Sequence, residues 1–383
     1  MDAQRNQQAA MILVVNPGST STKLALYAGR EELFNERVGH NTEELARFPA
    51  ILDQLEFRKQ VILSLLEERS QFQTERLQAV VGRGGLLHPL KGGVYGVNDT
   101  MKKDLRTARY GAHASNLGAL LADLLAREYG VEAYIADPVV VDEMGPLARY
   151  TGLPEISRKS IFHALNQRAT ARKAAAELGV SYGECNLIVA HLGGGTSVAI
   201  HQGGRITDVN NALDGDGPFS VERAGQLPSG DWLRYILSQG GRTQMLQKKL
   251  TGRGGIVAHL GSNDMQLIEQ IIDPSGKQRS QESNLDPAKC LEVVQAMCYQ
   301  VSKEICSLAA VVEGRIDAVV LTGGLAWNRR IVEEIRARVQ FLASFMVFPG
   351  ENEMEALAYA VEDVLQGREP LREYSDTESR SLK

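Results

Sequence analysis

An internal repeat constrains the fold of this chain more than any other feature. Residues 12–30 (ILVVNPGSTSTKLALYAGR) resemble residues 187–205 (LIVAHLGGGTSVAIHQGGR). Both segments have the pattern of an apolar strand, a loop of Gly, Ser and Thr, a second strand, and a Gly turn that ends in Arg. Gly18 matches Gly193, and the alignment slips by one residue within the loop. The repeat predicts two related halves, each of which opens with a hairpin whose turn is rich in glycine and hydroxyl groups.

The rest of the chain alternates short apolar runs with longer helical patterns, which favours an α/β architecture. After Ser115, leucines recur at helical spacing until Gly130, which predicts a helix with one buried face. Asp286 followed by Pro287 is a strong helix start, and that helix is expected to run to about Glu313.

Polar or glycine residues stand at the ends of five predicted strands. In open α/β sheets, ligands bind outside the carboxyl ends of the strands, so these residues are expected to line one crevice. They are Asn16, Arg83, Asp137, His191 and Gly323.

Length and composition indicate the domain organisation and exclude some partners. A chain of 383 residues suits two domains, and a net charge of -5 without basic runs argues against nucleic acid or a membrane surface. No apolar stretch approaches the roughly 18 residues of a membrane span. The four cysteines form no CxxC pair and indicate thiols in a reducing cytoplasm.

The expected boundaries follow from these patterns. Residues 1–10 are interpreted as a flexible extension without the apolar core of a secretory signal. The first domain is expected over 11–147 and the second over 148–350. A C-terminal helix at 351–370 is expected to return to the first domain, and 371–383 to form a frayed tail.

The loops at Asn16–Lys23 and His191–Ser197 could each be a polar turn or a phosphate cradle. The first lacks the second glycine of a Walker A loop, and the chain has no GxGxxG. Both offer backbone N–H groups and hydroxyls, which suit the oxygens of a polyphosphate. Their equivalent places in a repeat favour phosphate binding for both.

Phosphoryl transfer also needs cations and a metal. Arg83 and Arg223 follow glycine-rich segments and are the candidate cations, although a single arginine is commonly a solvated surface residue. Asp137, Glu351 and Glu353 could hold Mg²⁺ or be ordinary surface acids.

These segments together resemble the acetate and butyrate kinases, and the butyrate kinases most. The resemblance rests on VNPGSTSTK, HLGGGTS, DVNNALDGDGPFS and PGENEMEALA and spans about residues 11–365. These kinases belong to a superfamily with sugar kinases, heat-shock chaperones and actin. The resemblance implies two duplicated ribonuclease H-like (actin-like ATPase) domains around a central cleft that holds Mg-ATP.

The resemblance also implies roles for particular residues. The catalytic group is Arg83, Arg223, His163, Asp137 and His113, in which the arginines bind the carboxylate and phosphoryl groups and His163 stabilises the transition state. Asp137 and Glu353, with Glu351 as an alternative, are implied as metal ligands. ATP or ADP is expected to bind Asn16, Ser19, Ser21, Lys23, His191, Gly193, Gly194, Gly195, Thr196, Gly323, Gly324, Leu325 and Asn328.

Some positions depart from acetate kinases. Gln167 stands where those enzymes have a second histidine, Gly194 where they have Asn, and Gln266 where an Arg contacts the base. The predicted acyl pocket is Gly85, Ala112, Phe162 and Ala212. Three of these positions carry smaller residues than in acetate kinases. We therefore expect space for extra methylenes, each of which contributes roughly 0.8 kcal/mol when buried.

The expected reaction is butanoate + ATP ⇌ butanoyl phosphate + ADP, in a cytoplasmic homodimer or larger homo-oligomer. Acetate, propionate or a branched acid is the alternative substrate. A non-catalytic actin-like or chaperone-like ATPase is a more remote alternative. A sugar kinase with Asp137 as base is a further alternative, and a nicotinamide dehydrogenase is disfavoured by the missing GxGxxG.

Overall fold

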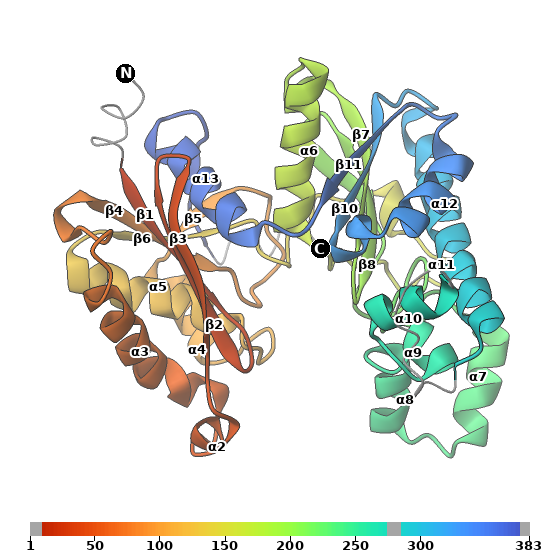
Figure 1. Cartoon of the computed structure of the whole chain (residues 1–383), viewed down its shortest axis with the longest axis horizontal. Coiled ribbons are helices and arrows are strands. Elements are labelled where there is room, and N and C mark those ends of the chain that lie inside the picture. The colour runs from red at the N-terminus through yellow and green to blue at the C-terminus, as the bar shows by residue number, and fades with distance from the viewer. Residues whose placement is uncertain (1–9, 274–284, 376–383) are drawn as a thin grey trace. The chain divides into compact units, whose positions relative to one another are not determined.

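The computed structural model describes residues 10–273 and 285–375 of the chain. These residues form two compact units (Figure 1). The first unit combines the described residues up to Asp142 with those from Asn352 onward, and the second unit is Glu143–Glu351. The chain therefore passes between units a few residues from the positions expected from the sequence. Of the extension expected at 1–10, residues 1–9 lie outside the described part.

The first unit is built on a seven-stranded sheet in the order β12-β5-β6-β4-β1-β2-β3. β4 runs parallel to both β1 and β6, whereas β1, β2 and β3 form an antiparallel meander. The strands are β1 (Met11–Pro17), β2 (Ser21–Ala28), β3 (Glu31–Gly39), β4 (Leu77–Arg83), β5 (Val94–Gly96), β6 (Glu132–Ala136) and β12 (Leu371–Arg372).

Helices cover both faces of this sheet. Met11, Leu13 and Val15 of β1 share a hydrophobic cluster with residues of α3 (Leu55–Glu67) and α5 (Asn116–Tyr129). Successive side chains of a strand point to opposite faces. Asn16 thus faces the other side, where it contacts α13 (Glu353–Leu365). α4 (Asp99–Arg106) packs on α5, and the short α2 (Thr42–Leu45) follows β3.

The second unit has a five-stranded sheet in the order β11-β10-β7-β8-β9. β11, β10 and β7 are parallel, and β7, β8 and β9 are antiparallel. The strands β6-β4-β1-β2-β3 of the first unit have the same directions in the same order, which confirms the predicted duplication. The strands are β7 (Asn186–Leu192), β8 (Thr196–Gln202), β9 (Arg205–Val209), β10 (Ala318–Gly323) and β11 (Ser344–Pro349).

Alternation along β7 places a helix on each face of the second sheet. Leu187 and Val189 pack with alanines of α6 (Ala164–Leu178), whereas Ile188 and Ala190 join the cluster that contains α11 (Pro287–Leu308). The remaining helices are α7 (Ser229–Ser238), α8 (Thr243–Leu250), α9 (Gly255–Leu260), α10 (Met265–Ile272) and α12 (Arg329–Val339).

The predicted helix ends can be compared with the structure. Asp286 caps α11 by accepting from the amides of Ala288 and Lys289, as predicted, but the α-helix ends at Leu308 and continues only as a 3₁₀ turn. Gly130 ends α5 in the left-handed conformation, with φ of 68°.

The expectation of a frayed tail over 371–383 is wrong for its first residues. β12 pairs with β5, and the buried Tyr374 donates a hydrogen bond of 2.7 Å to Asp104 and stacks on His88. An aromatic side chain with both an apolar slot and a hydroxyl partner holds this segment in place. Residues 376–383 lie outside the described part. Among the described residues, no helix is long and apolar enough to cross a membrane.

Candidate active site

The first predicted phosphate loop joins β1 to β2. The Gly18 amide donates to the Ser21 carbonyl at 2.7 Å, which makes a tight turn with Ser19 and Thr20 exposed at its tip. Asn16 and Lys23 are cross-strand partners, so their side chains lie on the same face of the sheet. Ser21 accepts a hydrogen bond from Arg37 at 3.0 Å.

Glu353, the first residue of α13, joins the ends of two neighbouring strands. Its carboxylate accepts from Asn16 Nδ2 at 2.7 Å and forms an ion pair of 3.0 Å with Arg83 Nη1. Arg83 is the last residue of β4, which packs tightly on α5: a Cβ on Gly82 would lie 2.1 Å from the Gly118 carbonyl oxygen. The structure thus brings three predicted site residues together.

Asp137 directly follows β6 and has a strained backbone. Its φ is 38°, a left-handed value that non-glycine residues rarely adopt. The buried carboxylate accepts from the Gly93 amide at 2.7 Å, and its own amide donates to the Gly93 carbonyl at 3.1 Å. Strain of this kind clusters at functional sites.

His113 precedes α5 and has a defined tautomer. Its Nδ1 accepts from the Ser115 amide at 3.2 Å and lies 2.9 Å from the Ser115 hydroxyl. The proton of the neutral ring is therefore on Nε2. Partial desolvation, followed by the positive charge of Arg83, lowers the pKa of His113. The ring is thus held neutral and can donate a hydrogen bond from Nε2.

In the second unit, two predicted histidines stack on each other. His163 directly precedes α6, and its ring centroid is 3.8 Å from that of His191 at the end of β7. His191 Nδ1 donates to Asn166 at 2.7 Å, and Asn166 in turn donates to the Glu351 carbonyl at 2.9 Å. Sequence analysis missed Asn166, although it lies three residues after His163 on the same helix face.

The second predicted phosphate loop, His191–Ser197, is held at its glycines by hydrogen bonds from a neighbouring turn. The Gly194 carbonyl accepts from the Glu222 amide at 3.0 Å and from the Ser220 hydroxyl at 2.6 Å. A Cβ on Gly195 would lie 3.6 Å from His163 Cε1. The Thr196 hydroxyl is buried and has no hydrogen-bond partner among the described residues. An unsatisfied donor beside three glycines suits an anionic ligand.

Gln167, which replaces a second histidine of acetate kinases, holds Ser197 in place. Its buried amide donates to the Val189 carbonyl at 3.2 Å, the Ser197 carbonyl at 3.0 Å and the Ser197 hydroxyl at 3.2 Å. Because that hydroxyl accepts from Gln167, its proton can go to His163 Nδ1, 3.0 Å away. In the neutral ring, the His163 proton then sits on Nε2.

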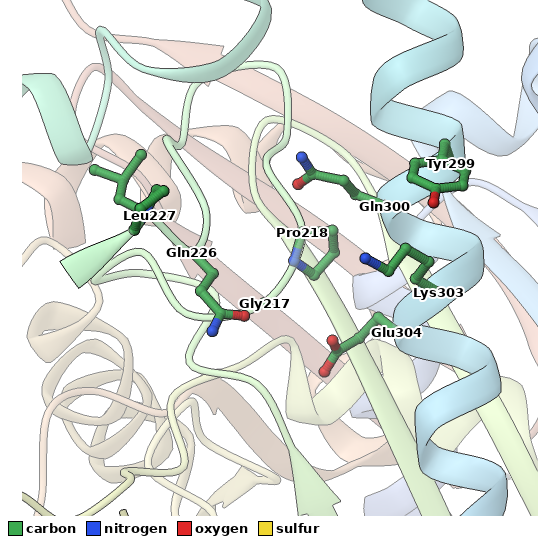
Figure 2. A pocket seen from close by; sticks show the side chains of 9 residues that line it. Gly217, Pro218, Gln226, Leu227, Tyr299, Gln300, Lys303 and Glu304 are labelled. Carbon is green, nitrogen blue, oxygen red and sulfur yellow. The ribbon is translucent and has the colours of Figure 1, made fainter. Parts of the chain in front are cut away.

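Arg223 lies in a turn closed by Ser220, whose amide donates to the Arg223 carbonyl at 3.1 Å. The guanidinium is 3.6 Å from the Glu222 carboxylate, and its buried Nε has no hydrogen-bond partner among the described residues. This turn belongs to the loop 217–228. A pocket of about 360 Å³ lies between the two ends of that loop and α11, and Figure 2 shows the side chains that line it. There Gln300 accepts from the Phe219 amide at 3.2 Å, which ties the loop to the helix.

The predicted nucleotide loop follows β10. Gly323 has φ of 89°, and a Cβ there would lie 2.4 Å from the Leu192 carbonyl oxygen, so only glycine fits. Apart from its chain neighbours, no atom of the described residues lies within 4 Å of a Cβ position on Gly324. Leu325 is mostly buried, and Asn328 caps α12 by accepting from the Ile331 amide and also donates to Glu269 at 3.1 Å.

The predicted acyl-pocket residues have different environments. Ala112 is exposed, Phe162 is buried, and the Ala212 amide donates to the Ile161 carbonyl at 3.0 Å. A Cβ on Gly85 would lie 2.7 Å from Asn116 Cα and 2.8 Å from Leu105 Cδ2. The interpretation of Gly85 as space for the acyl chain is therefore wrong: the missing side chain lets the start of α5 approach the loop.

The strand ends are thus grouped by unit. Asn16, Arg83 and Asp137 lie at or next to the carboxyl ends of the neighbouring strands β1, β4 and β6 of the first unit, and His191 and Gly323 at those of the neighbouring strands β7 and β10 of the second. Glu351 belongs to the second unit, where its carboxylate is 3.7 Å from His191 Nε2. Glu353 belongs to the first.

Comparisons with solved structures support the fold. The acetate kinase of Porphyromonas gingivalis matches with a TM-score of 0.74 and 18% identity, covering 94% of this chain and 100% of that one. A propionate kinase from Francisella tularensis matches with a TM-score of 0.68 and 17% identity, covering 92% and 99%. Two duplicated actin-like domains, as predicted, are the fold of this chain.

The acetokinase family profile matches residues 154–363, more than half of the chain. The chain therefore belongs to the acetokinase family and is a kinase that uses ATP or ADP. Among its curated relatives, butyrate kinase 2 of Clostridium acetobutylicum is 47% identical over 363 residues, which cover 95% of this chain and 99% of the relative. A probable butyrate kinase of Listeria monocytogenes has the same identity and coverage.

Proposed function

We propose that this kinase phosphorylates a short-chain fatty acid, in the reaction butanoate + ATP ⇌ butanoyl phosphate + ADP. The observation that carries the proposal is the 47% identity, over 95% of the chain, to a butyrate kinase. The alternatives that remain within the same chemistry are acetate, propionate and branched acids.

The proposed step is a direct in-line transfer. A carboxylate oxygen forms a bond to the γ-phosphorus while the bond to the bridging oxygen breaks, and that electron pair leaves with ADP. A carboxylate is already ionised at neutral pH, so the step requires no general base. Catalysis then consists of positioning and of neutralising charge.

Arg83 and Arg223 are proposed to bind the carboxylate and the transferring phosphoryl group. Arg83 is paired with Glu353 at 3.0 Å, and Arg223 lies 3.6 Å from Glu222. Both guanidiniums are partly exposed, so an anion can replace or share their carboxylate partners. The planar fork of a guanidinium matches a carboxylate or a phosphate better than an ammonium does.

The histidines are proposed as hydrogen-bond donors. The contacts of His163 with Ser197 and of His113 with Ser115 place the ring protons on Nε2. Nε2–H of His163 is proposed to donate to the equatorial oxygens of the transferring group, where charge develops. His191, itself proposed to lie at the phosphates of the nucleotide, also supports the His163 ring by stacking on it.

Mg²⁺ is the proposed metal, and it would neutralise charge on the phosphates. No group of three or more metal-binding side chains occurs within the described residues. Mg²⁺ commonly uses one or two carboxylates together with phosphate oxygens and water, so such a group is not required. Asp137 and Glu353 of the first unit fit this role as oxygen ligands, with Glu351 as the alternative.

The loops are proposed to hold the nucleotide. Asn16, Ser19, Ser21 and Lys23 of the first loop and Gly193–Thr196 of the second would bind the phosphates. Adenosine is proposed to bind at Gly323–Asn328, where a Cβ on Gly324 would meet no described residue other than its chain neighbours within 4 Å. The oligomeric state is proposed to be a homodimer or larger, and the free cysteines support a reducing cytoplasmic setting.

The test is to incubate the enzyme with Mg-ATP, butyrate and hydroxylamine. The proposal predicts butyryl hydroxamate in amounts equal to the ADP formed. ADP without hydroxamate from any short acid would contradict it and point to a non-catalytic or sugar-kinase relative.

A further inference from the structure

Arg58 of α3 lies directly beneath the first phosphate loop. Its side chain is fully buried, at 0% exposure. Nη2 donates to the Ser19 carbonyl at 3.0 Å, and Nη1 donates to the Ser21 carbonyl at 3.2 Å and to the Thr22 hydroxyl at 3.0 Å. Nε and Nη2 both donate to Gln54, at 3.1 Å and 2.8 Å. The guanidinium therefore binds the turn on the side that faces α3.

All of these acceptors are neutral. Of the ion pairs between described residues, none includes Arg58. Desolvation lowers the pKa of Arg58, with no carboxylate to oppose it. An arginine nevertheless stays protonated in proteins, so a positive charge is buried here without a counter-charge.

His40 adds no charge of its own. It is buried, and its Nε2 lies 2.8 Å from the Thr22 hydroxyl. Burial, followed by the charge of Arg58, lowers the pKa of His40 to about 4, so the ring is neutral at physiological pH. The hydroxyl that accepts from Arg58 can donate its proton to this ring.

The contact with Ser19 also sets the direction of a backbone donor. In a planar trans peptide, the carbonyl oxygen and the following N–H point in opposite directions. Because the Ser19 carbonyl points to Arg58, the Thr20 amide points away from it, toward the exposed side of the loop. That amide has no acceptor in the part of the chain that the structure describes.

We propose that Arg58 is a positioning residue for the phosphates of ATP, acting through the loop and through its uncompensated charge. It turns the Thr20 amide outward as a phosphate donor, and its field favours an anion on the far side of the hairpin. The effect of a buried charge is weakly screened by solvent. This inference rests on the proposed role of the first loop in ATP binding.

The test compares the affinities of the enzyme for adenosine, ADP and ATP by calorimetry without a carboxylate. We expect Arg58→Gln to weaken ATP binding by about 10-fold or more, to weaken ADP binding less, and to leave adenosine unchanged. Arg58→Lys, which keeps the charge, should recover a large part of the loss. Arg69→Gln is the matched control, because it removes a partly exposed cation of the first unit that pairs with Glu36.

The inference would be overturned if a folded Arg58→Gln variant lost the same factor of affinity for adenosine as for ATP, or if its affinities were unchanged. Either result would leave the proposed function intact. Failure of the wild-type enzyme to bind ATP would overturn both. If Arg58→Gln does not fold, hydrogen exchange of the wild-type enzyme decides. The Thr20 amide should exchange at least several-fold more slowly with ATP than with adenosine, and equal exchange rates would contradict the proposal.

Discussion

The rings of His163 and His191 stack with 3.8 Å between centroids and 11° between planes. One ring precedes α6 and the other ends β7. Ser197 and Asn166 bind their Nδ1 atoms, so each ring is fixed by a hydrogen bond as well as by the stack. The arrangement suggests different roles for the two residues: His163 is the proposed catalytic histidine, and His191 helps to hold its ring in position.

We predict that His163→Ala lowers kcat by about 100-fold or more with a smaller effect on KM, because a donor to the transition state is lost. His191→Ala should reduce kcat less, since it removes support and not the donor. Steady-state kinetics with the favoured acid measures both effects. The exposed His259→Ala variant is the control, and an unchanged kcat for His163→Ala would refute the assigned role.

The predicted acyl pocket can be tested at Ala112, whose small side chain is exposed. Ala112→Leu should lower kcat/KM for butyrate by about 10-fold while affecting acetate less, because added bulk excludes methylenes. The ratio of the two kcat/KM values is the measurement. Ala288→Leu, at an exposed position in the second unit, controls for a general effect, and an unchanged ratio in Ala112→Leu would count against the pocket.

Gly85 should matter for stability and not for substrate choice. A Cβ there would lie 2.7 Å from Asn116 Cα, so Gly85→Ala is predicted to destabilise the fold by about 1–3 kcal/mol. Gly96→Ala is the matched control, since no described residue other than its chain neighbours lies within 4 Å of its Cβ position. Urea unfolding provides the comparison. A fully stable Gly85→Ala variant that prefers acetate would restore the original interpretation.

Buried His201 should make stability depend on pH. Burial, followed by the charge of Arg168, lowers its pKa to about 3, against about 6.5 in the unfolded chain. Between these values the unfolded state binds more protons, so the unfolding free energy falls as pH falls. Above about pH 6.5 His201 does not reduce the unfolding free energy. Below that pH it lowers the unfolding free energy by up to about 1.4 kcal/mol per pH unit.

The check is urea unfolding of wild type and His201→Gln at pH 7, 6 and 5. His201→Gln should lose stability less steeply with acid, whereas the control His259→Gln should follow wild type. Identical slopes for His201→Gln and wild type would show that His201 titrates as it does in the unfolded chain.

Sequence patterns predict those elements whose structure is set by residues close together in the chain. The repeat predicted both hairpins, and the Asp286-Pro287 pair predicted the start of α11, because strand alternation and helix capping are encoded by near neighbours. Asn16, Arg83, Asp137, His191 and Gly323 lie at or next to the carboxyl ends of their strands, as predicted, whereas the single crevice that they are expected to line remains a prediction. Their assigned roles remain predictions.

Features set by distant contacts were not predictable in the same way. Arg58 lies within an ordinary amphipathic helix, and only the fold places it under Ser19. Tyr374 follows a polar run that is typical of a frayed end, yet it finds Asp104 across 270 residues of sequence. Space for a ligand at Gly85 is a natural prediction from the sequence, because a missing side chain has the same sequence signature whether it admits a ligand or a neighbouring helix.

The central claim is tested most directly by kcat/KM with Mg-ATP for acetate, propionate, butyrate, isobutyrate and valerate, with the acyl phosphate trapped by hydroxylamine. We predict a maximum at four carbons, with acetate lower by about 10-fold or more. Equal or higher values for acetate would contradict the butyrate assignment, and no hydroxamate from any acid would contradict carboxylate phosphorylation itself.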